Sequence, residues 1–330
     1  MHKIALAARR QLPAMDLPFL VLVLALVAFG LVMLGSASSA VALYRRGDAY
    51  AYLRPQLLYA ALGLGALSWY FLPKDNSPQA GILDYTAQGF LAEPENSLDV
   101  VILGDSVPLC AFSPQVMEET TGLRAYVCAT TGQTLPKTET FLREFVRNQS
   151  PELVILEANH LYKTFTPLDW AEESLYREVP LLRYHDNWKF LKPAQALSPV
   201  CYSVRIPERG YYEKEGVEGL VVSDYMAYTE DWDPIPEESL RAVSRIAALC
   251  ENRGARLLLL SAPSAANWSY YSHNAVAALA DSLGAGYVDM NLEQVTIDWT
   301  QDTPDAGDHL NGTGAEKASR WLAEYLRGTL

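Results

Sequence analysis

Apolar runs alternate with amphipathic stretches along most of the chain, and this alternation predicts strands followed by helices. Runs that are apolar throughout predict buried strands at 98–104, 124–129, 151–158, 255–263 and 285–290. Apolar residues recur at helical spacing between them, over 113–122, 135–149, 237–254, 272–284 and 314–326. Buried strands that alternate with helices form parallel sheets covered on both faces. The predicted fold class is therefore α/β, a three-layer doubly wound parallel sheet, in which ligands bind beyond the carboxyl ends of the strands.

Two longer apolar stretches precede the α/β pattern, and they predict that residues 1–73 are a membrane segment. The first carries no charge and is long enough to cross a bilayer as a helix over about 17–39. The second predicts another span over about 55–73, with a buried helix of the soluble part as the alternative. Three basic residues stand before the first span: Lys3, Arg9 and Arg10. Because cytoplasmic flanks are rich in Lys and Arg, we expect the amino end in the cytoplasm.

Two further regions lack a regular pattern. Residues 74–97 are polar with prolines and glycines, which predicts an extended lead-in to a domain over 98–330. Residues 160–236 are rich in Tyr, Trp, Pro and charge, and we interpret them as an irregular insertion in that domain. Their aromatic side chains are expected to form the core of a covering lobe, with a ligand cage as the alternative.

Composition narrows the classes of partner and cofactor. The chain has 330 residues and a formal net charge of -13, which argues against a nucleic-acid partner, since little here would neutralise phosphates. Its four cysteines form neither a C-x-x-C pair nor a zinc spacing with histidine, so we expect no metal and no cofactor. We interpret them as buried small hydrophobes, with a Cys110–Cys128 disulfide as an open alternative.

One predicted strand ends on residues that suit chemistry. The apolar run stops at Gly104-Asp105-Ser106, which is either an ordinary turn or a nucleophilic serine at the carboxyl edge of the sheet. A serine hydroxyl is a weak nucleophile, so it needs a base that is itself oriented by a third group. Partners for Ser106 must therefore be found elsewhere in the chain.

His309 is the best candidate for this base among the five histidines of the chain. It stands just before the last helix, with Asp305 and Asp308 within four residues. We expect Asp305 to orient the imidazole, because Pro304 and Gly307 can turn the loop so that residues 305 and 309 face each other. Asp308 is an immediate neighbour and is expected to point outward or to cap the helix. The alternative is that the whole loop only approaches and caps the last helix.

Together the two motifs resemble the SGNH or GDSL hydrolase superfamily, over about 71–330. The resemblance rests on "VVILGDS" near the start of the domain and "DAGDHLNGTGAEKAS" near its end. It is greatest for membrane-anchored proteins of Gram-positive bacteria, which are distantly related to alginate O-acetylation and teichoic-acid D-alanylation proteins. The resemblance implies a serine esterase or O-acyltransferase that acts through an acyl-enzyme.

The resemblance also implies roles for particular residues. Ser106, His309 and Asp305 would form the catalytic triad, and the Ser106 and Gly132 backbone with the Asn159 amide would form an oxyanion hole. The superfamily usually spaces its acid and base as D-x-x-H. Here an alanine holds that position, so Asp305 stands one residue earlier than usual and Asp308 remains the alternative acid.

The membrane segment resembles a different family, the SEDS glycan polymerases, over about the first 67 residues. "GLVMLGSASS" and the "RPQ" before the second apolar stretch match the first two transmembrane helices of that family. The remaining helices of the family have no counterpart here, so the resemblance does not imply polymerase activity.

The membrane segment and the resemblance together imply a membrane-anchored serine esterase or O-acyltransferase, and the resemblance implies an acylated envelope glycan as its substrate. Its partners would be that O-acyl ester and the lipid bilayer, with other envelope-assembly proteins left open. Two spans would leave the catalytic domain in the cytoplasm, whereas the resembled hydrolases place it outside behind a single span, and we expect the outside placement. The alternatives are a non-catalytic envelope scaffold with an inherited fold, or a fusion remnant of a SEDS-type cell-division protein.

Overall fold

The structure is a computed structural model that describes residues 17–80, 82, 84–189, 192–222 and 224–329. The chain divides into two compact units. The first comprises Met1–Leu72 and Val179–Lys189, and the second comprises Pro73–Glu178 and Phe190–Leu330. Residues 179–189, which the sequence analysis assigned to an insertion in the domain, therefore belong with the N-terminal helices.

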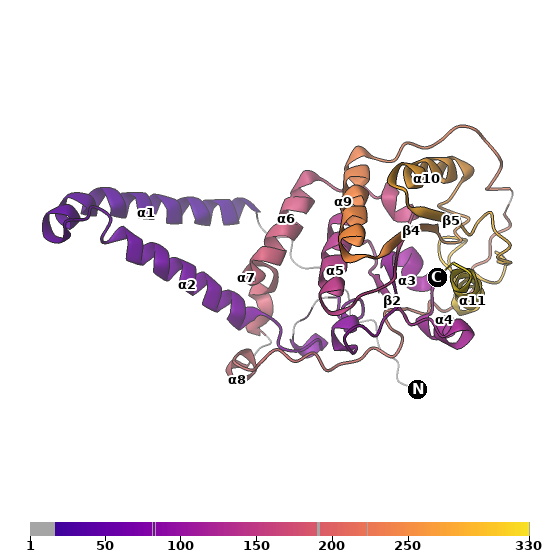
Figure 1. The fold of residues 1–330 in the computed structure, drawn as a ribbon, viewed down its shortest axis with the longest axis horizontal. Coiled ribbons are helices and arrows are strands. Elements are labelled where there is room, and N and C mark those ends of the chain that lie inside the picture. The colour runs from indigo at the N-terminus through magenta and orange to yellow at the C-terminus, as the bar shows by residue number, and fades with distance from the viewer. Residues whose placement is uncertain (1–16, 81, 83, 190–191, 223, 330) are drawn as a thin grey trace. The chain divides into compact units, whose positions relative to one another are not determined.

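A parallel sheet of five strands, in the order β2-β1-β3-β4-β5, forms the centre of the second unit (Figure 1). The strands are β1 (Val100–Gly104), β2 (Ala125–Ala129), β3 (Leu153–Glu157), β4 (Arg256–Ser261) and β5 (Gly286–Asp289). Gly104 pairs with Ala129 and Leu103 with Leu156, so β1, β2 and β3 end level with one another. The predicted doubly wound parallel sheet is confirmed.

Helices cover both faces of this sheet. They are α3 (Ser106–Ala111), α4 (Pro114–Thr121) and α11 (Gly312–Arg327) on one face, and α5 (Leu135–Asn148), α9 (Glu237–Arg253) and α10 (Tyr270–Leu283) on the other. Successive strand residues point to opposite faces, as a pleated strand requires. In β1, Val101 and Leu103 pack with α5 and α9, whereas Val100 and Ile102 pack with α4 and α11.

The irregular regions contain more structure than their sequence pattern predicts. The lead-in forms two 3₁₀ turns, η1 (Pro78–Ala80) and η2 (Gly89–Ala92), and Phe90 of η2 is fully buried against Tyr126 and Phe145. The insertion contains η3 (Asn159–Tyr162), α6 (Pro167–Glu178), α7 (Pro180–Tyr184), η4 (His185–Lys189) and α8 (Pro193–Ala196). These elements are too short, or too dependent on single aromatic residues, to show a periodic pattern.

The aromatic residues of the insertion divide into two groups. Trp170 of α6 packs against the core, and the centre of its ring lies 3.7 Å from Arg245 Cζ. Tyr176 is buried. Tyr228 and Trp232 are instead exposed, at 73% and 64%. The expectation of a covering-lobe core therefore holds for the first group and is wrong for the second.

The cysteines are free, so the alternative of a Cys110–Cys128 disulfide is wrong. Cys110 lies in α3 and Cys128 lies inside β2, both buried, and Cys250 is buried as well. Cys201 is exposed, which corrects the interpretation of all four as buried hydrophobes.

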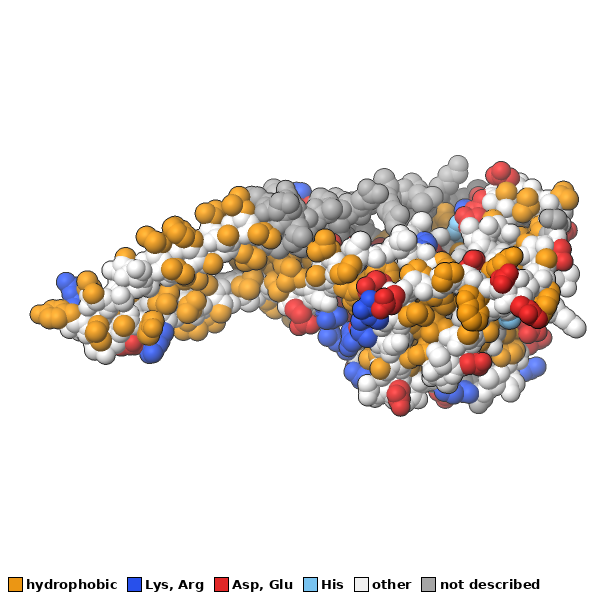
Figure 2. Space-filling model, turned by 90° about the horizontal axis from the view of Figure 1, so that it is seen from above, with side chains coloured by type: hydrophobic (Ala, Val, Ile, Leu, Met, Phe, Trp, Pro, Cys, Tyr) orange, Lys and Arg blue, Asp and Glu red, His pale blue; other side chains and the backbone are white. Residues whose placement is uncertain are grey.

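The first unit contains α1 (Leu17–Arg46) and α2 (Leu53–Phe71), with α7 and η4 packed against α2. In the described part of the chain, one helix is long and apolar enough to cross a membrane, Val21–Arg46, with a mean hydropathy of 2.4. Hydrophobic side chains line both helices (Figure 2). No residue of α2 is buried, so the alternative of a buried soluble helix is wrong. The basic residues that set the expected orientation, Lys3, Arg9 and Arg10, lie outside the described residues.

Candidate active site

Three of the predicted site residues lie just past the carboxyl ends of three neighbouring strands. Ser106 is the first residue of α3 after β1, Gly132 lies in the loop after β2, and Asn159 begins η3 after β3. Because β2, β1 and β3 are adjacent and end level, the three positions share one edge of the sheet. Asp105 sets the start of α3, since its Oδ1 accepts the Val107 N–H at 3.0 Å. The Ser106 N–H stands in the first turn and has no carbonyl partner within the helix.

His309 comes from a loop that turns back on itself before α11. Ala306 and Gly307 have positive φ angles of 53° and 89°, which reverse the chain between Asp305 and His309. Asp305 Oδ2 lies 2.7 Å from His309 Nδ1, and Asp305 Oδ1 accepts the His309 N–H at 2.9 Å. Asp305 is thus in position to orient the imidazole, and its catalytic role stays a prediction.

Asp308 neither points outward nor caps the last helix. Its Oδ2 lies 3.2 Å from His309 Nδ1, and its Oδ1 accepts a hydrogen bond from Asn267 Nδ2. The cap is supplied by Asn311, whose Oδ1 accepts the Gly314 N–H at 3.2 Å. The loop therefore caps α11, as the alternative expected, and it also brings both acids to the same ring nitrogen of His309.

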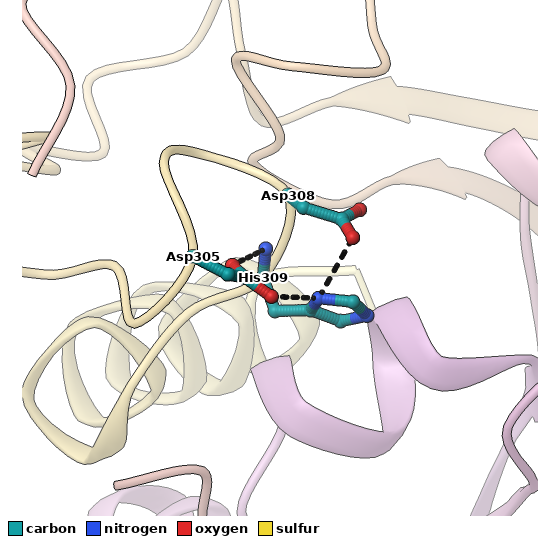
Figure 3. A group of neighbouring side chains, drawn as sticks. All are labelled: Asp305, Asp308 and His309. Carbon is teal, nitrogen blue, oxygen red and sulfur yellow. Dashed lines mark hydrogen bonds and ion pairs between the residues drawn. The ribbon is translucent and has the colours of Figure 1, made fainter. Parts of the chain in front are cut away.

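The other ring nitrogen of His309 faces away from the acids. Figure 3 shows both carboxylates beside Nδ1, with the far edge of the ring toward a helix in the colour of α3 and α4. Leu310, the next residue, packs in the same buried cluster as Val107 of α3. Among the described residues no hydrogen bond joins Ser106 to His309, whose side chain contacts Lys214, Asp305 and Asp308. Bonds of this kind often tighten only when a substrate binds.

The charges around His309 oppose one another. Burial lowers the pKa of His309, but the hydrogen bonds to Asp308 and Asp305 outweigh it, so the pKa lies above its usual value. Lys214 acts against this rise, because its ammonium pairs with Asp305 and lies 3.3 Å from Nδ1. Burial also raises the pKa of Asp305, yet hydrogen bonds to Lys214 and His309 hold it below the usual value, so this acid is ionised at neutral pH.

A buried polar network lies behind the loop that carries Gly132. Gln133 Nε2 donates to Thr138 Oγ1 at 2.8 Å, and Thr138 Oγ1 lies 2.8 Å from His160 Nε2. Thr130 Oγ1 donates to Gln133 Oε1 at 3.1 Å. Burial lowers the pKa of His160 to about 4, so this residue is neutral at pH 7, and its contact with Thr138 joins it to the network that supports the loop.

The Glu157 carboxyl group fixes the turn that carries Asn159. Glu157 is fully buried at the end of β3 and accepts the backbone N–H groups of Asn159 and His160 at 3.0 and 3.1 Å. Burial, followed by the charge of Asp105, raises the pKa of Glu157 to about 8. Asp105 is itself buried and forms an ion pair with Lys163.

The acid–histidine group has donor atoms that could also suit a metal ion. One ligand atom from each of Asp305, Asp308 and His309 lies within 4.8 Å of the others. The Lys214 ammonium already contacts Asp305 Oδ2 and lies 3.3 Å from His309 Nδ1, so a metal ion would have to compete with it for these two atoms.

An open polar groove of about 820 Å³ runs beside Lys214. It is lined by the segment before and after Lys214, by the start of α4 and by the start of α11, with Gln115, Tyr211, Glu213 and Thr313 among its residues. Its size is that of a small-molecule site, and its lining offers hydrogen bonds rather than an apolar surface.

Lys214, Asn267 and Lys163 were not found from the sequence. Each comes from an irregular segment far along the chain from its partner: Lys214 is 91 residues from Asp305, and Asn267 is 41 residues from Asp308. No motif or periodicity surrounds them. The one local signal was the unusual presence of two acids next to His309, which leaves room for a compensating cation.

Comparisons with known proteins return hydrolases at low identity. No protein-family model matches the chain, and no curated protein does. A lipase/acylhydrolase from Enterococcus faecalis is 10% identical, over 71% of this chain and 97% of its own, with a TM-score of 0.39. A GDSL-like lipase from Bacteroides thetaiotaomicron is 16% identical, over 70% and 88%, with a TM-score of 0.34. An acetylxylan esterase from Geobacillus stearothermophilus is 10% identical, over 70% and 95%, with a TM-score of 0.35.

Proposed function

We propose that this chain is a serine-dependent ester hydrolase or O-acyltransferase, anchored in a membrane by α1. The observation that carries the proposal is the acid–histidine group of Asp305, Asp308 and His309, whose imidazole has its far edge toward a helix in the colour of α3 and α4 (Figure 3), while Ser106 opens α3 at the end of a strand. A serine at a strand end and an acid-oriented histidine are the parts that nucleophilic acyl transfer requires.

The reaction divides into acylation and deacylation. His309 Nε2 takes the proton of Ser106 Oγ as the oxygen attacks the carbonyl carbon of the ester. Asp305 stabilises the imidazolium that forms, and His309 then gives the proton to the departing alcohol. Deacylation repeats these steps with water, or with the hydroxyl of an acceptor, as the attacking group.

The negative oxygen of the tetrahedral intermediate needs hydrogen-bond donors. This role is served by the Ser106 and Gly132 N–H groups and the Asn159 side-chain amide. The hydrogen bond of Gln133 to Thr138 supports the loop of Gly132, and the bond of the Asn159 N–H to Glu157 supports the turn of Asn159. Loss of one such donor typically lowers kcat by about 10²- to 10³-fold.

The substrate is an O-acylated glycan of the cell envelope. The groove beside Lys214 supports this assignment, because its polar lining suits the hydroxyl groups of a sugar. A single span of α1 would place the domain outside the cytoplasm. The competing function is an envelope scaffold with the same fold and no catalysis.

The test of activity uses the full chain in detergent. We expect it to hydrolyse p-nitrophenyl acetate and to release acetate from an O-acetylated oligosaccharide. Ser106→Ala should abolish both activities and also the labelling by a fluorophosphonate probe, located by mass spectrometry. Labelling at another serine would refute the assignment of Ser106, and an inactive, unlabelled wild type would favour the scaffold.

Cys201 offers a test of the side of the membrane. It is the exposed cysteine, whereas the other three are buried. In intact cells, a membrane-impermeant maleimide should label the wild type and fail to label Cys201→Ser. Labelling of the wild type only after the membrane is permeabilised would place the domain in the cytoplasm.

A further inference from the structure

An extended segment of the insertion runs between the helix of Ser106 and the loop of His309. We call residues 209–222 the strap. On one side its backbone bonds to β2 and α3, through Val127 N–H to Arg209 O (2.9 Å) and Tyr212 N–H to Leu109 O (2.9 Å). On the other side it bonds to residues 299–306, through Glu218 N–H to Thr303 O (2.9 Å), Ala306 N–H to Glu218 O (2.8 Å) and Leu220 N–H to Trp299 O (2.8 Å). The strap therefore joins β2 and α3 to the loop that holds the acids.

The close approach of the strap to the sheet depends on a glycine. Gly210 has a φ of +89°, and a Cβ at this position would lie 1.9 Å from the Val127 carbonyl oxygen. A side chain cannot be accommodated there, so the path of the strap is built into the fold. Lys214 follows four residues later.

Lys214 extends from the strap into the acid–histidine group. Its Nζ pairs with Asp305 Oδ2, the same oxygen that lies 2.7 Å from His309 Nδ1. Nζ also lies 3.3 Å from Nδ1. Because an ammonium has no lone pair, Lys214 and a protonated Nδ1 both donate to Asp305. The carboxylate is thus held between two donors.

The charge around His309 explains why a lysine belongs there. Asp305 and Asp308 together carry two negative charges within 3.2 Å of Nδ1, and Lys214 offsets one of them. The sum is one negative charge, the same as a single acid supplies in an ordinary triad. Without the lysine, two carboxylates would stabilise the imidazolium further and raise the pKa of His309, so that less of the neutral base would be present at neutral pH.

We propose that Lys214 is a positioning residue of the active site, which holds Asp305 and balances the second acid, so that the strap is a working part of the catalytic machinery. The inference rests on the proposed function for its catalytic meaning. Other ionisable groups near His309 do not replace Lys214. They are Cys110, whose pKa burial raises to about 12, Asp105, which pairs with Lys163, Glu213, which lies against Gly312, and Asp302, which pairs with Lys317.

The test measures the titration of His309 directly. Histidine Cε1 is labelled with ¹³C in the full chain in detergent, and the His309 signal is assigned by its loss in His309→Gln. Lys214→Met should raise the His309 midpoint by roughly one to two pH units, since it removes a charge in contact with the ring. Lys214→Arg should restore the wild-type midpoint. Lys137→Met, which removes the same charge from an ion pair with Asp84, is the matched control and should leave the midpoint unchanged.

A midpoint that Lys214→Met leaves within about 0.2 pH units of wild type would overturn the inference. An equal shift in Lys137→Met would overturn it as well. Lys214→Gln provides the same charge change should the Met variant fail to fold. Hydrolysis of p-nitrophenyl acetate gives the second readout, in which the acid limb of kcat/KM should move with the midpoint. Absence of Ser106-dependent hydrolysis in the wild type would refute the proposed function, whereas the NMR midpoint decides the role of Lys214 by itself.

Discussion

Replacing Asp305 with asparagine tests which carboxylate orients His309. Asp305 contacts His309 twice, at the ring (2.7 Å) and at the backbone N–H (2.9 Å). Loss of the orienting acid in a serine protease lowers kcat by about 10⁴-fold, because the imidazole adopts the wrong tautomer. Here Asp308 remains 3.2 Å from Nδ1 and still favours the tautomer with an unprotonated Nε2. We therefore expect Asp305→Asn to lower kcat/KM by about 10²- to 10³-fold, less than in the protease.

Asp308→Asn is the matched comparison. The Asp308 side chain is 43% exposed and makes one longer contact with the ring, so solvent weakens its effect. A hydrogen bond of about 0.5–1.5 kcal/mol corresponds to a loss of roughly 2- to 10-fold in kcat/KM. Because Asp308 raises the pKa of His309, its removal should also move the acid limb of kcat/KM to lower pH.

Both variants are compared with the wild type in initial rates of p-nitrophenyl acetate hydrolysis between about pH 5 and 9, with folding checked by circular dichroism. An inactive Asp308→Asn beside a nearly wild-type Asp305→Asn would show that the roles of the acids are reversed. Full activity in both would show that His309 needs neither acid, or that it is not the base.

Two further predictions concern stability. Leu322→Ala empties a fully buried site of α11 and should lower the free energy of unfolding by about 2–5 kcal/mol, whereas the exposed Arg320→Ala should change it by less than about 0.5, in denaturant titrations followed by near-UV circular dichroism. Burial lowers the pKa of His160 from 6.5 to about 4, so below pH 6.5 the unfolded chain binds the proton that the folded chain refuses. Stability should therefore fall as the pH drops from about 6.5 to 4, and a His160→Gln variant with the same slope would contradict this.

The sheet could be predicted because its strands are buried on both faces. Such strands are apolar without interruption, as in Val100 to Leu103, and their alternation with helical stretches favours a parallel sheet. The common edge of Ser106 and Asn159 could be predicted as well, because the carboxyl ends of parallel strands lie at the same edge of a sheet. The pairing of Asp305 with His309 is local, and the turn-forming residues Pro304, just before Asp305, and Gly307, between the two, made it visible.

The parts that escaped prediction depend on contacts between distant segments. Phe90 fills a gap between Tyr126 and Phe145, and nothing near it in sequence marks it as core. The strap forms neither helix nor strand and shows no periodic pattern, and its place is fixed by backbone bonds to the rest of the fold. Asp308 was misplaced for a related reason, because the capping role expected of it is taken by Asn311.

The unusual spacing of acid and base and the lysine of the strap are parts of one arrangement, and this can be tested by a double-mutant cycle. Asp305 stands one residue earlier than usual, Asp308 lies 3.2 Å from the ring nitrogen as a second acid, and the charge of Lys214 offsets one of the two carboxylates. The net charge of the three groups around His309 is -2 in Lys214→Met, zero in Asp308→Asn, where Lys214 balances Asp305, and -1 in the double variant, as in the wild type. The single variants should therefore shift the His309 midpoint in opposite directions, and the double variant should lie close to wild type. Because charges in one network couple, the double variant should also keep more of its neutral-pH activity than Lys214→Met alone. A double variant with the high midpoint of Lys214→Met would show that Asp308 does not act on His309, and the charge balance would then be the wrong explanation for Lys214.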